Sequence, residues 1–205
     1  MTQVLIDGLR KKTTQMKRRL PFALALVVVG LLVACSFFGQ RVTIAENERG
    51  VVADEQGELQ ILAPGAHTLS PFMQSVEVYS LADQTYTMKG QPETDGVVIG
   101  NDAIETRSKD GRQLWIDAAV TFRFVESKLI EVRRTWQGSE RFLNGFIRPA
   151  TRNIVYTTAF QFSWEEATSS KRGEFETAVS QKLAEEFSRQ GVELAKFSLL
   201  DVRGE

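Results

Sequence analysis

The sequence predicts an α+β domain that follows a single transmembrane helix. Three observations predict it: an uncharged apolar segment at 20–38, short strand-like runs with turns between them at 42–124, and helical periodicity at 127–190 before a final strand at 192–202. A run of strands followed by a run of helices is typical of the α+β class. We therefore expect one domain over 42–202, with a mainly antiparallel sheet and packed helices.

The apolar segment is long enough to cross a membrane. Its 19 residues would form a helix of about 28 Å, close to the hydrocarbon thickness of roughly 30 Å. The side chains expected to contact lipid are Leu20, Phe22, Leu24, Leu26, Val28, Leu31, Leu32, Val33, Phe37 and Phe38.

The basic segment at 1–19 predicts the orientation of this span. Lys17, Arg18 and Arg19 directly precede the apolar segment, and three further basic residues lie upstream at 10–12. By the positive-inside rule, the N-terminus is cytoplasmic and the domain lies on the opposite side. That side is the periplasm in a bacterium and the intermembrane space in a mitochondrion.

Cys35 leaves a second interpretation open. The tetrapeptide Leu32-Val33-Ala34-Cys35 resembles a lipobox, in which cleavage before a lipidated cysteine would remove 34 residues. Leader peptides normally total about 15–30 residues, so the long basic flank favours a retained span. In that interpretation Cys35 is a small apolar residue of the helix; otherwise it is a lipidation site.

Composition narrows the classes of function. Hydrophobic residues make up 42% of the 205 residues, charged residues 25%, and the net charge is -1. The hydrophobic and charged fractions are typical of a globular protein. The net charge argues against a nucleic acid as a partner, because proteins that bind nucleic acids are usually basic. Cys35 is the only cysteine, so the domain has no disulfide and its hydrophobic core must stabilise it.

Glycine pairs mark the expected turns of the strand-rich half. Gln56-Gly57 and Pro64-Gly65 predict two reversals, and Asp110-Gly111 predicts a two-residue hairpin turn. The strand that follows this hairpin alternates strictly. The apolar face carries Leu114, Ile116, Ala118, Val120, Phe122 and Phe124.

Capping residues mark the expected helices. We expect Ser127 to cap a short helix that ends at Trp136, and Ser139 to cap another that Pro149 kinks or restarts. Ser163 and Glu166 have the spacing of a capping box that opens a long helix. Gly191 is expected to end that helix.

Two kinds of surface contact are candidates for function. Pro71, Phe72 and Met73 form an apolar loop tip that is a possible membrane contact, with packing inside the domain as the alternative. A possible oligomer interface comprises Trp115, which lies on the polar face of its strand, and the apolar stripe of the long helix. That stripe contains Phe175, Val179, Leu183 and Phe187, and its default interpretation is packing on the chain's own sheet.

The sequence offers no combination of residues for catalysis, so we expect no catalytic residue, metal or cofactor. The only histidine, His67, has no motif of serine, cysteine or zinc chemistry beside it. Glu165 and Glu166 are paired carboxylates, but in a first helical turn they complement the helix dipole.

Several segments together resemble one protein superfamily. In order they are "ERGVV", "APGAHTLSPF", "SVEVYSLADQTYTM", "SKDGRQLWIDAAVTFRF", "FIRPATRNIV" and "GVELAKFSLLDV". Behind a single N-terminal span, this order resembles the SPFH or Band 7 superfamily of stomatin, prohibitin and flotillin over about 42–202. The "PG-x-H-x-L-x-PF" turn makes prohibitin-like members the most similar.

This resemblance implies a membrane scaffold and no enzymatic activity. Such domains assemble on membranes into rings or cages that enclose lipids and often a membrane AAA protease. The resemblance also implies a long coiled-coil helix after the last strand, whereas this chain stops at Glu205. We therefore expect either a truncated chain or assembly through the domain alone. The competing hypotheses are a lipoprotein binding module acylated at Cys35 and a membrane-tethered hydrolase that depends on His67.

Overall fold

The computed structural model describes residues 40–70, 75–90 and 101–204. The expected span, its basic flank, Cys35 and the Pro71-Phe72-Met73 loop lie outside the described residues. The described residues fall into two compact units, one of 40–42 with 67–70, and one of 43–66, 75–90 and 101–204. Within these ranges no helix has both the length and the apolar character needed to cross a membrane.

Two small sheets are formed by the first five strands. Strand β1 (Gln40–Ile44) pairs with β4 (Gly65–Leu69), and β2 (Glu48–Ala53) lies between β3 (Leu59–Leu62) and β5 (Glu77–Ser80). The β2–β3 turn contains Gly57 at φ 85°, and Gly65 has φ 129°. Both values lie in the region that glycine favours, so the two predicted glycine turns are confirmed.

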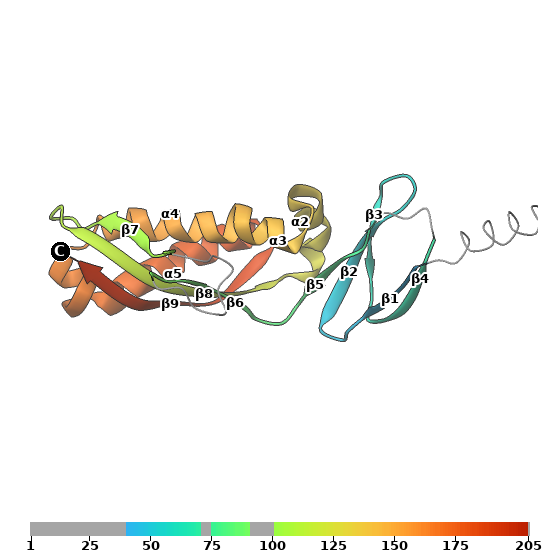
Figure 1. The fold of residues 1–205 in the computed structure, drawn as a ribbon, viewed down its shortest axis with the longest axis horizontal. Helices are drawn as coiled ribbons and strands as arrows, with labels where there is room; N and C mark the ends of the chain where they lie inside the picture. The colour runs from blue at the N-terminus through green and yellow to red at the C-terminus, as the bar shows by residue number, and fades with distance from the viewer. Residues whose placement is uncertain (1–39, 71–74, 91–100, 205) are drawn as a thin grey trace, which may run out of the picture. The chain divides into compact units, whose positions relative to one another are not determined.

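The main sheet is built on β8 (Gln113–Phe124). Strand β9 (Val192–Gly204) pairs antiparallel along its whole length, while β6 (Gln84–Met88) and β7 (Ile104–Arg107) pair with separate parts of its other edge (Figure 1). The six predicted inward residues of β8, from Leu114 to Phe124, are all buried. The alternation in the sequence thus identified the core face correctly.

The β7–β8 turn differs from the expected two-residue hairpin. The amide of Ser108 donates to the carbonyl of Arg112 at 2.9 Å, so three residues, 109–111, form the loop. Gly111 adopts φ 84°, as in a type I turn closed by a left-handed residue. The sequence predicted the turn glycine correctly, but it predicted a loop of two residues where the structure has three.

The helical half comprises several elements that cover one face of this sheet (Figure 1). They are a 3₁₀ turn (Glu126–Lys128), α2 (Leu129–Trp136), α3 (Ser139–Phe142), a π-helical turn (Leu143–Ile147), α4 (Arg148–Ala159), a second π-helical turn (Glu166–Ser170) and α5 (Arg172–Arg189). Pro149 lies in the first turn of α4, directly after the π-helical turn at Leu143–Ile147, where the helical hydrogen-bond register changes. The predicted restart at this proline is confirmed.

The predicted helix starts had mixed outcomes. Ser127 lies inside the 3₁₀ turn and makes no cap, and Ser139 donates its amide and hydroxyl to Glu77. Ser163 and Glu166 do form the reciprocal capping box: the amide of Ser163 donates to Glu166 Oε2 at 2.9 Å, and the amide of Glu166 donates to Ser163 Oγ at 3.3 Å. However, Lys171 interrupts the expected long helix, which resumes at Arg172.

The apolar stripe of α5 belongs to the domain's own core. Phe175, Val179, Leu183 and Phe187 are all 0% exposed. The ring of Phe187 contacts Phe122 on β8, with 6.3 Å between centroids, and Phe146 at 5.6 Å. These four side chains are therefore corrected from a candidate subunit interface to core residues, because packing on β8 and β9 leaves none of their surface for another protomer.

Tyr79 on β5 gives a test of this core. Its ring meets Phe124 edge to face at 5.2 Å, and its buried hydroxyl has no hydrogen-bond partner among the described residues. Burial, reinforced by Glu77, raises the pKa of Tyr79 to about 12. A buried hydroxyl without a partner costs roughly 1–3 kcal/mol, so Tyr79→Phe is expected to raise the free energy of unfolding.

The pH dependence of stability should change with the same substitution. Between pH 10 and about 12 the unfolded chain releases the Tyr79 proton while the folded chain keeps it, so stability falls as pH rises through this window. Tyr79→Phe should flatten that fall in denaturant titrations at pH 8 and pH 11. At pH 8, where both phenols are neutral, the matched control is Tyr86→Phe: it removes a hydroxyl bonded to Asp102 and should lower stability, whereas Tyr79→Phe should raise it. Equal losses in the two variants would contradict the prediction.

Candidate functional site

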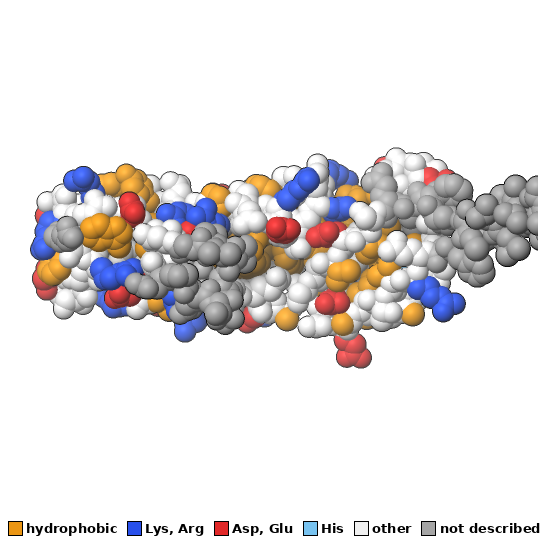
Figure 2. Space-filling model, in the orientation of Figure 1, with side chains coloured by type: hydrophobic (Ala, Val, Ile, Leu, Met, Phe, Trp, Pro, Cys, Tyr) orange, Lys and Arg blue, Asp and Glu red, His pale blue; other side chains and the backbone are white. Residues whose placement is uncertain are grey.

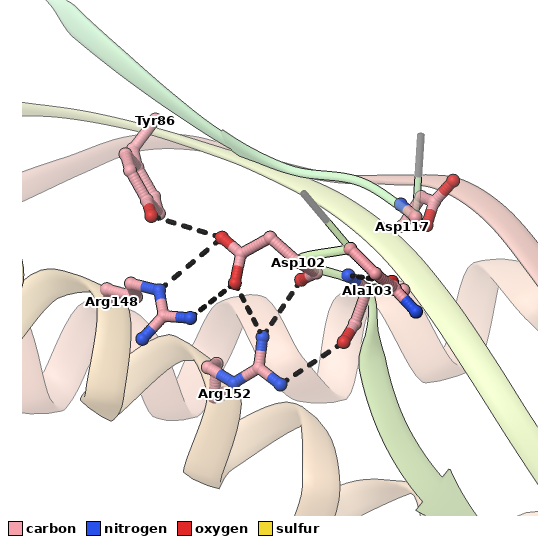
Figure 3. A network of polar contacts seen from close by, with 8 residues as sticks. Tyr86, Asp102, Ala103, Asp117, Arg148 and Arg152 are labelled. Carbon is pink, nitrogen blue, oxygen red and sulfur yellow. Dashed lines mark hydrogen bonds and ion pairs between the residues drawn. The ribbon is translucent and has the colours of Figure 1, made fainter. Parts of the chain in front are cut away.

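A buried carboxylate, Asp102, joins the main sheet to helix α4. Its side chain is 4% exposed and lies just before β7. The hydroxyl of Tyr86 on β6 donates to Oδ2 at 3.1 Å. Two guanidinium groups from α4 reach the same carboxylate, and all four side chains converge in Figure 3.

The two guanidinium groups come from successive turns of one helical face. Arg148 donates through Nη2 to Asp102 Oδ1 at 2.5 Å and through Nε to Oδ2 at 3.4 Å. Arg152, four residues later, donates through Nη1 to Oδ1 at 3.1 Å and to the Asp102 carbonyl at 2.9 Å, and through Nη2 to the Ala103 carbonyl at 3.1 Å. A spacing of four places both side chains on one side of the helix.

The protonation states in this cluster are set by burial and charge. Burial, together with the Asp102 carboxylate, raises the pKa of Tyr86 to about 12, and the hydrogen bond to Asp102 raises the pKa of Arg148. At neutral pH the phenol is therefore neutral and the guanidinium is charged. A carboxylate whose oxygens are occupied by two cations and a phenol is suited to structural pairing rather than to proton transfer.

A second carboxylate, Asp117 on β8, binds Gly90, the residue that directly precedes residues 91–100. Its Oδ1 accepts the amide of Gly90 at 2.9 Å and Nη2 of Arg203 at 2.6 Å. Arg203 also pairs with Asp201 at 3.2 Å. Nearby, the amide of Asp102 donates to the Lys89 carbonyl at 2.8 Å. The chain is thus held on both sides of this segment.

The predicted site residues that the structure describes do not meet in one site. Trp115 is half-buried on the outer face of β8 and lines a 390 Å³ hollow with Arg203 and Gly204. His67 lies on β4, and Glu166 acts in the capping box and pairs with Lys171 at 2.7 Å. Within the described ranges, no three His, Cys, Asp or Glu side chains are grouped to hold a metal.

Sequence reasoning missed Asp102 and its partners. The available signal was the pair of arginines at a spacing of four on a helix whose other residues are uncharged. Such a pair predicts a shared anionic partner. Which carboxylate it binds is determined by the fold, because Asp102 precedes Arg148 by 46 residues.

Removing the charge of Asp102 should be costly. Asp102→Asn leaves two partly buried guanidinium groups without their counterion, for which losses of about 3 kcal/mol or more are typical. Asp201→Asn is the matched control, since it removes an exposed partner of Arg203 and should cost less than about 1 kcal/mol. Urea denaturation of the full chain in detergent measures both. Similar stabilities for the two variants would show that Asp102 does not hold α4.

Comparison with known proteins agrees with this fold. The family model of the SPFH domain / Band 7 family matches residues 42–204, which include the small three-stranded sheet, the main sheet and the helical layer. A comparison with curated protein sequences found no match. The match covers most of the 205 residues, and the antiparallel sheets with packed helices fit this domain. The chain therefore belongs to the SPFH domain / Band 7 family.

Proposed function

We propose that this protein is a membrane-anchored oligomeric scaffold. The observation that carries the proposal is an SPFH domain at 42–204 that begins just after an apolar segment at 20–38. Proteins of this family commonly form homo-oligomers and associate with membranes. The orientation proposed from the basic flank places the domain on the outer side, which is periplasmic in a bacterium.

The proposed mechanism is geometric and involves no catalysis. Many tethered copies that share one surface gain avidity, because each further contact forms at a high effective concentration. An assembly of this kind confines the lipids and membrane proteins inside it. The Asp102 cluster supports this interpretation, since Asp102 is the most deeply buried carboxylate among the described residues and its two arginine partners give it a structural role.

We assign the protein to the prohibitin-like members on the "PG-x-H-x-L-x-PF" turn at 64–72. A membrane AAA protease is the client we propose, because a ring of tethered domains can enclose such a protease and limit its access to substrates. Pro71, Phe72 and Met73 remain the proposed membrane contact. Trp115, half-buried on the outer face of β8, remains a candidate for contact between copies.

The alternative function is a lipoprotein binding module acylated at Cys35. The tetrapeptide Leu32-Val33-Ala34-Cys35 supports it, and the module would act as a monomer or small oligomer. The two functions differ in the mass of the subunit and in the mass of its assembly.

The size of the complex in mild detergent tests the scaffold. We expect particles many times the 23.0 kDa subunit from native membranes, measured by mass photometry, with an intact subunit mass that corresponds to the whole chain. A small particle whose subunit begins at a diacylated cysteine would replace the scaffold with the lipoprotein module.

Substitution of Cys35 separates the same two functions in cells. Cys35→Ala should leave membrane residence and subunit mass unchanged, because a span does not require that side chain. Ser36→Ala is a neighbouring control. Accumulation of an unprocessed precursor only in Cys35→Ala would contradict the retained span.

A further inference from the structure

Strand β9 forms a long edge of the main sheet. It spans 13 residues and pairs with β8 along one side. Among the described residues no strand pairs with its other side, whereas β6 and β7, on the opposite side of β8, are only five and four residues long. A long unpaired edge is a template on which a strand of another chain can form hydrogen bonds. The contacts along this edge therefore decide whether two copies can join their sheets.

Two side chains of α5 bind the backbone in the middle of this strand. Arg172, the first residue of α5, donates through Nη2 to the carbonyl of Leu199 at 2.8 Å and to that of Leu200 at 3.1 Å. One turn later, Glu176 Oε2 accepts the amide of Leu199 at 3.2 Å. An added strand would bond to the N–H and C=O of one residue in the same way. Arg172 and Glu176 are called the edge-protecting pair.

The edge-protecting pair acts where β9 has a bulge. The register with β8 shifts at this point, so Leu200 has no opposite residue on β8. Its side chain is 42% exposed, whereas that of Leu199 is buried. A bulge interrupts the ladder of hydrogen bonds between two strands, so the backbone groups there need partners from outside the ladder. The two α5 side chains supply those partners.

The same position is the uncharged part of the outer half of β9. Exposed charged residues of β9 lie on both sides of it: Glu193, Lys196, Asp201 and Arg203. Figure 2 shows acidic and basic side chains at the surface where the C-terminal end of β9 lies in Figure 1. Charges on an edge strand oppose pairing with another strand, because covering the edge removes water from them. The stretch at 197–200 has no charge of its own, and the edge-protecting pair binds there.

We propose that the edge-protecting pair prevents β9 from pairing with β9 of a second copy. Without Arg172 and Glu176, the stretch at 197–200 would present free N–H and C=O groups beside an exposed leucine. Two such edges can pair antiparallel about a two-fold axis, because both copies present the same surface. The pair thus restricts contact between copies to surfaces other than this edge. The inference depends on the described domain alone, so it does not require the scaffold function.

Hydrogen exchange of the full chain in detergent tests the proposal. In the wild type, exchange of the peptide 192–204 should not depend on protein concentration, because side chains of the same chain bind the edge. In Arg172→Ala with Glu176→Ala, its slowest protected amide at the bulge should exchange about tenfold faster at low concentration, as expected for a lost hydrogen bond to a charged group. At high concentration this exchange should slow again as edges pair. Fast exchange at every concentration would overturn the proposal.

Arg189→Ala with Glu186→Ala is the matched control. It also removes one arginine and one glutamate from α5, but these two side chains pair with each other at 3.1 Å. Exchange at 192–204 should therefore equal that of the wild type at both concentrations. Protection that rises with concentration in this control would mean that lost charge on α5, rather than an opened edge, causes association, and the proposal would be wrong.

A third variant separates strand pairing from misfolding. Leu200→Lys, added to Arg172→Ala with Glu176→Ala, restores no hydrogen bond but places a charge in the uncharged stretch of the edge. The exposed position of Leu200 should accept lysine without a change in the core. Exchange should then stay fast at high concentration. Protection that persists in this variant, or that rises with concentration in the wild type, would overturn the proposal. A monomeric wild type would refute the scaffold and leave this inference unchanged.

Discussion

The pairing of Asp102 with Arg148 and Arg152 is the interaction on which the domain's arrangement depends most. It links β6 through Tyr86, the start of β7 through the Ala103 carbonyl, and α4 through two turns. A buried carboxylate is unfavourable unless it is paired and hydrogen-bonded. Helix α4 must therefore lie where both guanidinium groups reach Asp102, which gives the helical layer a single position along the strands.

The same interaction shapes the surface of α4. Both of its cations are directed inward, so the exposed side of the helix keeps only uncharged side chains around Tyr156 and Phe160. The charge pair that positions α4 therefore leaves Tyr156 and Phe160 exposed with no charged side chain of α4 itself beside them.

The hydrophobic core supplies most of the favourable free energy around this pair. The inward face of β8 packs against two helices: Phe122 contacts Phe187 on α5, and Phe124 contacts Phe142 on α3. The whole-length pairing of β8 with β9 connects residues far apart in the sequence, and the register shifts at two points along it. The sequence has no cysteine after Cys35, so no disulfide can fix β9 to the domain. The pairing with β8 and the core contacts hold this last strand in place.

The sequence predicted correctly those features that depend only on residues close together in the chain. The alternation of β8, the capping box at Ser163 and Glu166, and the glycine turns at Gly57 and Gly191 depend on neighbouring residues. The capping roles predicted for Ser127 and Ser139 were wrong, although α3 does begin at Ser139, because serine also favours turns and distant partners. Ser139 bonds to Glu77, which lies 62 residues away.

The sequence by itself determined the α+β class, the order of strands and helices, the inward face of β8 and the family. Only the tertiary structure decided that the α5 stripe is core, that Asp102 holds α4, and that Tyr156 and Phe160 remain outside. The physical reason is that periodicity shows which side of an element is apolar, whereas the identity of what covers that side depends on contacts between residues distant in the chain.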